Sequence, residues 1–132
     1  MKHTLKDFKV GDTVYLRCIN NAARMFKTGE LPIREATIDR VGRKYLTVQL
    51  PWAEVRFEQN DSMPTGMIHV TEYSQDYVLY KTKEELLDDL EKFALRKKIE
   101  DHIRQYAWAR NLTLDEVKQI AKILRIDEAE NV

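Results

Sequence analysis

The sequence predicts an α+β fold in which a small antiparallel β-barrel over residues 1–80 precedes two or three amphipathic helices over residues 81–132. Two observations lead to this prediction. All four glycines and all three prolines precede residue 81, and the fifty-two residues from there to the end contain neither. Apolar and polar residues alternate with a period of two in the first part, whereas apolar residues recur every three or four positions in the second.

Four segments of the first part alternate as half-buried strands do. The first is KVGDTVYL, at residues 9–16, and the others are REATIDRV, KYLTVQL and AEVRFE. Each places its apolar side chains on one face, so we expect these faces to form the core of the barrel. The predicted inward-facing residues are Val14 and Leu16, Ala36 and Ile38, Leu46, Val48 and Leu50, and Val55 and Phe57.

Turn residues separate these segments. The inward set changes from even to odd numbers across Pro51-Trp52, which predicts a tight turn or a bulge there. Gly42, in RVGRK, is expected to adopt a positive φ in a hairpin turn. A short segment after Gly66, MIHV, extends the count to four or five strands. The long connection from Asn20 to Pro32 is expected to hold one helical turn and to carry binding residues.

The second part contains two helix-start signals. TKEE at Thr82–Glu85 and TLDE at Thr113–Glu116 both fit a capping box. An apolar stripe that includes Leu86 and Leu87 is followed by a second stripe from Leu95, which predicts either one long helix or a kink near residues 96–98. The last helix is expected to end near Ile126 and the chain to fray after it.

Composition restricts the class of protein. Lys and Arg number 22 and Asp and Glu number 22, so the net charge is zero, which argues against a protein that coats DNA non-specifically. The single cysteine, Cys18, excludes a disulfide framework within one chain. No apolar run resembles a leader or a membrane span. We therefore expect a cytoplasmic protein with no membrane partner.

Catalytic and metal-binding patterns are missing from the sequence. The three histidines, His3, His69 and His102, stand far apart and do not have the spacing of metal ligands. The two serines, Ser62 and Ser74, lie in turn-like sequence, and the four glycines never gather into a phosphate loop. We therefore expect no enzyme activity, no cofactor and no metal site.

Binding residues are expected in the long connection, in the hairpin RVGRKY and at the Pro51-Trp52 turn. Basic side chains contact phosphates, and aromatic side chains stack on bases or anchor protein interfaces. A mixed, solvated surface is the competing interpretation, and the acidic side chains of the outward strand faces oppose a phosphate backbone lying across the sheet. The candidate residues are Arg24, Phe26, Lys27, Arg40, Arg43, Lys44, Tyr45 and Trp52.

Two segments carry a resemblance to known barrels. DFKVGDTVYL and REATIDRVGRKYLTV, within residues 7–58, resemble the opening strands of SH3-like barrels, among them the KOW-type barrels that bind nucleic acid. The order of barrel and charged, capped helices also resembles small uncharacterised proteins of phages and mobile elements of Firmicutes. That resemblance implies an inhibitor of a host nucleoprotein machine, of the anti-CRISPR type.

These observations support two functional hypotheses. The first is a non-catalytic module that docks through residues 20–32 and 40–45 onto a protein or nucleoprotein partner, with a phage or mobile-element inhibitor of a host nuclease as its most specific form. The alternative is direct binding of nucleic acid in transcription or replication. The sequence leaves the oligomeric state open.

Overall fold

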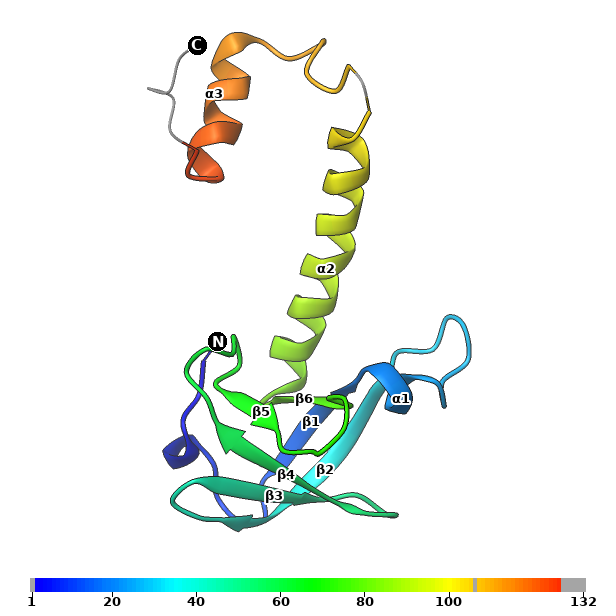
Figure 1. Cartoon of the computed structure of the whole chain (residues 1–132), viewed down its shortest axis with the longest axis vertical. Helices are drawn as coiled ribbons and strands as arrows, with labels where there is room; N and C mark the ends of the chain where they lie inside the picture. Colours follow the sequence, from blue (N-terminus) through cyan, green and yellow to red (C-terminus); the bar gives the residue numbers. More distant parts are fainter. Residues whose placement is uncertain (1, 106, 127–132) are drawn as a thin grey trace. The chain divides into compact units, whose positions relative to one another are not determined.

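The structure is a computed structural model that describes residues 2–105 and 107–126. It confirms the α+β class: a six-stranded, nearly closed antiparallel barrel is followed by helices (Figure 1). The chain divides into two compact units, Met1–Leu90 and Glu91–Val132, each described here by itself. The elements in order are η1 (Leu5–Asp7), β1 (Thr13–Cys18), α1 (Asn20–Ala23), β2 (Ile33–Val41), β3 (Tyr45–Gln49), β4 (Glu54–Gln59), β5 (Met67–His69), β6 (Tyr77–Tyr80), α2 (Lys83–Ile103) and α3 (Leu114–Ile123).

The six strands form one antiparallel sheet in the order β5-β4-β3-β2-β1-β6. β5 and β6 therefore stand at opposite ends of this order although they are neighbours in sequence. The sheet curls until these two strands come into contact, as Figure 1 shows. The rings of His69 in β5 and Tyr77 in β6 lie with their centroids 5.4 Å apart, and the Asp76 N–H donates to His69 Nδ1 at 3.1 Å. This contact almost removes the exposed edges that an open sheet would present.

The predicted core is confirmed in full. All nine residues assigned to the inward faces are buried, and Phe57 is the largest among them with no exposed surface. Leu5, the first residue of η1, and Phe8, directly after this helix, join the same cluster from outside the sheet, and Met67 and Leu79 join it from β5 and β6. Burial of large apolar side chains of this kind contributes about 1.5–3 kcal/mol each to the free energy of folding.

A two-residue turn accounts for the change from even to odd inward positions. Leu50 and Ala53 exchange backbone hydrogen bonds across Pro51-Trp52, at 2.8 and 3.3 Å. The register then pairs Val48 with Val55, so an even position in β3 lies opposite an odd one in β4. The predicted tight turn is confirmed, and the four or five predicted strands become six.

The prediction for Gly42 is wrong. Positive φ angles occur at Gly11, Gly29 and Gly66 but not at Gly42. The irregularity of the β2–β3 pair lies inside the strand instead, where the register shifts between Ile38 and Arg40. This bulge absorbs the extra residue, so the turn itself needs no left-handed glycine.

The N-terminal segment is fastened to the barrel by His3. Its backbone N–H donates to Thr65 O at 3.0 Å, and its ring Nε2 lies 3.0 and 3.1 Å from the two carboxylate oxygens of Glu85 in α2. Gly66 passes so close that a Cβ built on it would stand 2.0 Å from the carbonyl oxygen of His3. Three distant parts of the sequence therefore meet at one buried histidine.

The first turns of α2 belong to the barrel unit. Thr82 Oγ1 accepts from Glu85 N at 3.2 Å, as the predicted cap requires, while the Glu85 carboxylate contacts His3. The Tyr80 hydroxyl donates to Asp89 Oδ2 at 2.6 Å, and burial together with this bond raises the pKa of Tyr80 to about 12. Leu86 is the buried residue of α2, whereas Leu87 of the predicted stripe is exposed.

The second unit contains the rest of α2, which continues to Ile103 without the alternative kink, and α3. The TLDE capping box is confirmed, because Thr113 Oγ1 accepts from Glu116 N at 3.1 Å and Glu116 Oε1 accepts from Thr113 N at 2.9 Å. None of the residues that the structure describes in this unit is buried. Helix α3 ends at Ile123, and the frayed end expected after Ile126 lies outside the described residues. Packing of these later helices on the barrel stays a prediction.

We expect Gly66→Ala to lower the free energy of unfolding by at least about 2 kcal/mol, because it adds a backbone clash to the strain of a positive φ. Gly29→Ala is the matched control: its φ is +92°, close to the +88° of Gly66, but its Cβ would meet nothing within 4 Å. Urea unfolding of both variants checks the prediction. Equal losses for the two would show that close approach to His3 contributes nothing.

Acidification below about pH 6.5 is expected to destabilise the barrel through His69. Burial lowers the pKa of His69, although the nearby Asp76 carboxylate opposes this, and the neutral Nδ1 must accept the Asp76 N–H. The unfolded chain therefore binds a proton at a higher pH than the folded chain, and stability falls as the pH drops through the unfolded pKa.

Urea unfolding midpoints at pH 7.5 and 5.5 measure this effect. His69→Asn, whose amide oxygen can accept the same N–H, should show a smaller difference between the two pH values, while His102→Gln should behave as the unchanged chain does. An undiminished pH dependence in His69→Asn would assign the effect to another group.

Candidate functional site

The hairpin predicted to bind carries an open groove on the outer face of the sheet. β2, β3 and β4 run side by side, and the register places Arg40 opposite Thr47 and Thr47 opposite Arg56. Directly opposite residues of neighbouring antiparallel strands point to the same face, so these three side chains form one row. The groove has a volume of about 360 Å³, and we call it the hairpin groove; it is lined by Arg40, Gly42, Arg43, Lys44, Tyr45, Thr47 and Arg56.

An aromatic ring gathers the cations of the hairpin groove. Arg56 lies with its guanidinium carbon 5.2 Å from the centre of the Tyr45 ring, and Lys44 Nζ lies 5.4 Å from the same ring. Lys44 also pairs with Glu58 at 3.5 Å. Contact with the Tyr45 side chain and then with Glu58 raises the pKa of Lys44, so its ammonium group stays charged at neutral pH.

The local charge of the groove is positive although the whole chain is neutral. Four of the seven lining residues are Arg or Lys, and none is acidic. The sequence analysis counted the acidic side chains of the outward strand faces against nucleic-acid binding, but none of them lines the hairpin groove. Glu35 lines a separate pocket with Thr37 and Gln49, whereas Glu54 lines a neighbouring pocket that shares Thr47 and Arg56 with the groove. The groove therefore offers several cations and one aromatic ring to an anionic ligand.

A second cluster forms at the opposite end of β2. Arg34 lies with its guanidinium carbon 4.5 Å from the centre of the Phe26 ring and 5.2 Å from the Trp52 ring. Phe26 comes from the long connection after α1, and Trp52 comes from the β3–β4 turn. We call Phe26, Arg34 and Trp52 the arginine stack.

Tyr77 lies near the arginine stack. Burial raises the pKa of Tyr77, and the nearby Trp52 side chain opposes this increase. Despite its contact with Arg34, Trp52 remains 53% exposed. The indole is therefore covered in part while much of it stays open to solvent.

The eight predicted site residues thus fall into separate groups. Arg40, Arg43, Lys44 and Tyr45 meet in the hairpin groove, whereas Phe26 and Trp52 meet around Arg34. Arg24 and Lys27 are exposed on the connection between α1 and β2. From Arg34 to Arg40 the strand advances on the order of 20 Å, at the usual rise per residue. The two groups therefore lie at the two ends of β2.

Two site residues escaped the sequence-based prediction. Arg56 carries a signal, because its outward position in β4 follows from the alternation, but only the register places it beside the hairpin. Arg34 occupies an even-numbered position of β2, as the core residues Ala36 and Ile38 do. The sequence pattern therefore placed this arginine on the inward face and did not indicate that it contacts aromatic rings. Cys18, in contrast, is buried, and burial raises the pKa of its thiol to about 11.

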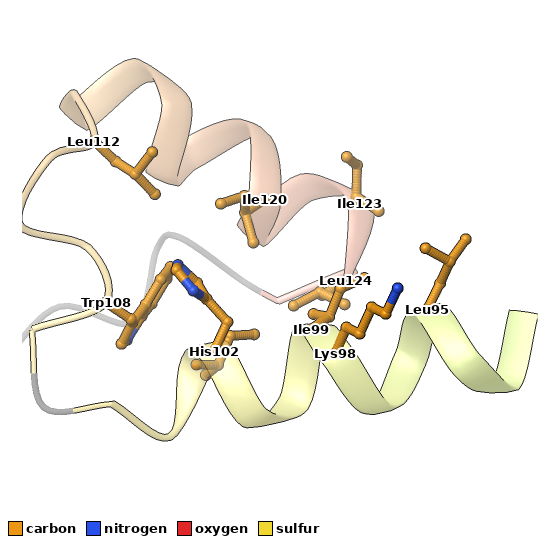
Figure 2. A pocket seen from close by; sticks show the side chains of 10 residues that line it. Leu95, Lys98, Ile99, His102, Trp108, Leu112, Ile120, Ile123 and Leu124 are labelled. Carbon is orange, nitrogen blue, oxygen red and sulfur yellow. The ribbon is translucent and has the colours of Figure 1, made fainter.

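The second unit has an apolar pocket of its own. Figure 2 shows it between the later part of α2 and α3, with a volume of about 570 Å³. Lys98 and His102 are the ionisable residues of its wall, and Leu95, Ile99 and Trp108 are among the apolar ones. The wall of this pocket is therefore mostly apolar and carries two ionisable side chains.

The described residues contain neither a cluster of metal ligands nor a membrane-spanning helix. Among residues 2–105 and 107–126, no group of three or more His, Cys, Asp or Glu side chains could hold a metal ion. Over the same residues, none of the helices combines the length and the apolar character that crossing a bilayer requires.

Comparison with known proteins gives one match. The family model described as phage ProQ C-terminal-like domain matches residues 1–130. Neither a curated protein nor a solved structure matches the chain.

Proposed function

The chain belongs to the family of phage ProQ C-terminal-like domains, and from this premise we propose that it is a non-catalytic module that binds the phosphate backbone of nucleic acid in the hairpin groove. One observation carries the proposal: the register of β2, β3 and β4 assembles Arg40, Arg43, Lys44 and Arg56 around Tyr45 with no acidic side chain in the wall.

The chemistry of the groove suits this ligand. Guanidinium and ammonium groups neutralise phosphates and release their counterions, and an aromatic ring adds stacking that does not depend on sequence. Two of these cations are already held by the Tyr45 ring, so less side-chain entropy is lost when a ligand binds. The proposal also accommodates the neutral net charge, because only the local surface must be basic.

Docking on a protein or nucleoprotein partner is the second candidate function, with an inhibitor of a host nuclease, of the anti-CRISPR type, as its most specific form. Large apolar side chains on the connection after α1 favour it: Met25 and Leu31 are both exposed there. Methionine and leucine side chains on a loop can anchor a protein interface.

The first function predicts a defined salt dependence. The affinity for a labelled twelve-nucleotide oligouridine should fall as salt rises from 50 to 300 mM, with a logarithmic slope of about −0.7 for each phosphate contact. Arg43→Ala combined with Lys44→Ala should weaken binding and make the slope shallower by about 1.4. Lys6→Ala combined with Lys9→Ala removes two exposed cations outside the groove and should leave the slope unchanged. Fluorescence anisotropy measures all three, and equal slopes would contradict the assignment of the groove.

The second function predicts protein capture that does not depend on nucleic acid. A pull-down from host extract, with and without nuclease treatment, should retain the same protein partners if docking is direct. Met25→Ser combined with Leu31→Ser should abolish that capture, while Val10→Ser, at another exposed apolar residue, should not. Loss of every partner after nuclease treatment would contradict direct protein docking.

A further inference from the structure

The arginine stack is not needed for phosphate binding, yet it holds an exposed aromatic ring in a fixed orientation. Phe26 and Trp52 reach Arg34 from two different connections, and the guanidinium stands over both rings at 4.5 and 5.2 Å. A ring with one face covered by a cation has lost part of its own freedom before any ligand arrives.

The exposed part of Trp52 needs an explanation. The residue is 53% exposed, so a large indole surface faces solvent beside the covered face. A tryptophan that only completed a core would be expected to bury this surface, since an indole contributes to stability chiefly by burial. A rigid, solvent-facing indole is instead suited to stack on a planar group, and stacking on a base costs little when the ring is already ordered.

We infer that Trp52 is a stacking platform for an unpaired nucleobase, with Arg34 as a positioning residue beneath it, and that the ligand of the hairpin groove is therefore single-stranded. This inference rests on the proposed function. Bases of a duplex are stacked on one another and cannot cover an indole, whereas a single strand can place its backbone in the groove and offer a base to Trp52.

The geometry of β2 and β3 relates the two contacts. The groove lies at the hairpin end of these strands and Trp52 at the opposite end of β3, in the turn that leads into β4. The separation, on the order of 20 Å at the usual rise of a strand, is spanned by a few nucleotides of an extended strand. Glu54, close to Trp52, disfavours a phosphate at this end but tolerates an uncharged base.

The test uses the full chain and two probes, a twelve-nucleotide oligouridine and a twelve-base-pair RNA duplex. The single strand should bind at least tenfold more tightly than the duplex. Trp52→Leu should weaken binding of the single strand roughly 5- to 100-fold, the usual range for loss of one stacked base, with no change in salt slope. Trp52→Phe, which keeps an aromatic face, should recover most of the affinity.

Quenching of the Trp52 fluorescence by oligouridine reports direct contact with a base, which a purely structural role of Trp52 would not produce. The chain has two tryptophans, so Trp108→Phe leaves Trp52 as the only indole. Oligouridine should quench its emission in proportion to binding. Arg34→Met should weaken binding without reducing the salt slope, because Arg34 orients the indole and touches no phosphate. A slope reduced by about 0.7 would place a phosphate on Arg34 and overturn its assigned role.

The outcomes separate this inference from the function on which it rests. If neither probe binds, both fail. If oligouridine binds through the groove but Trp52→Leu binds equally well, or if the duplex binds as tightly as the single strand, the groove stands and the stacking platform is overturned. An oligothymidine of the same length identifies whether RNA or DNA is preferred, and stacking supports the inference with either.

Discussion

The register of three antiparallel strands is the constraint on which the rest of the structure depends. β2, β3 and β4 pair so that Val48 lies opposite Val55 on the inner face and Thr47 lies opposite Arg56 on the outer face. A slip of one residue would turn Phe57 to solvent and Arg56 into the core. Exposing the large apolar ring and burying the guanidinium charge would both cost free energy of folding. The apolar core therefore fixes the basic groove without contacting it.

The same turn that sets this register also places the exposed indole. Pro51 and Trp52 form the two-residue connection between β3 and β4, and their length determines which side chains of β4 face inward. Trp52 then lies within reach of Arg34 at the start of β2. This two-residue turn therefore sets which residues of β4 face the core and also places the Trp52 ring on the surface. The ring is ordered by folding, before any ligand binds.

The distribution of charge is local. A net charge of zero is compatible with a groove lined by four cations, two of which contact one aromatic ring, because no carboxylate lines the groove itself. The helical unit differs in kind: its described residues include none that is buried, and its main pocket is apolar. The buried core of the described chain accordingly lies in the barrel unit and the first turns of α2.

The sequence by itself determined what depends on neighbours along the chain. Alternation identified nine inward-facing residues between Val14 and Phe57, and the TLDE signal marked the start of α3, because side-chain direction and capping are local properties of the backbone. It also indicated that the hairpin carries the basic residues.

Tertiary structure decided what depends on strand pairing. The bulge between Ile38 and Arg40 removed the need for a special glycine at residue 42, and the Glu85 carboxylate turned to His3, which lies 82 residues away. Only the register brought Arg56 to the hairpin, and only the tertiary fold brought Phe26 and Trp52, from two different connections, to Arg34. These contacts join residues far apart in sequence, and no local pattern specifies which distant partner a side chain will meet.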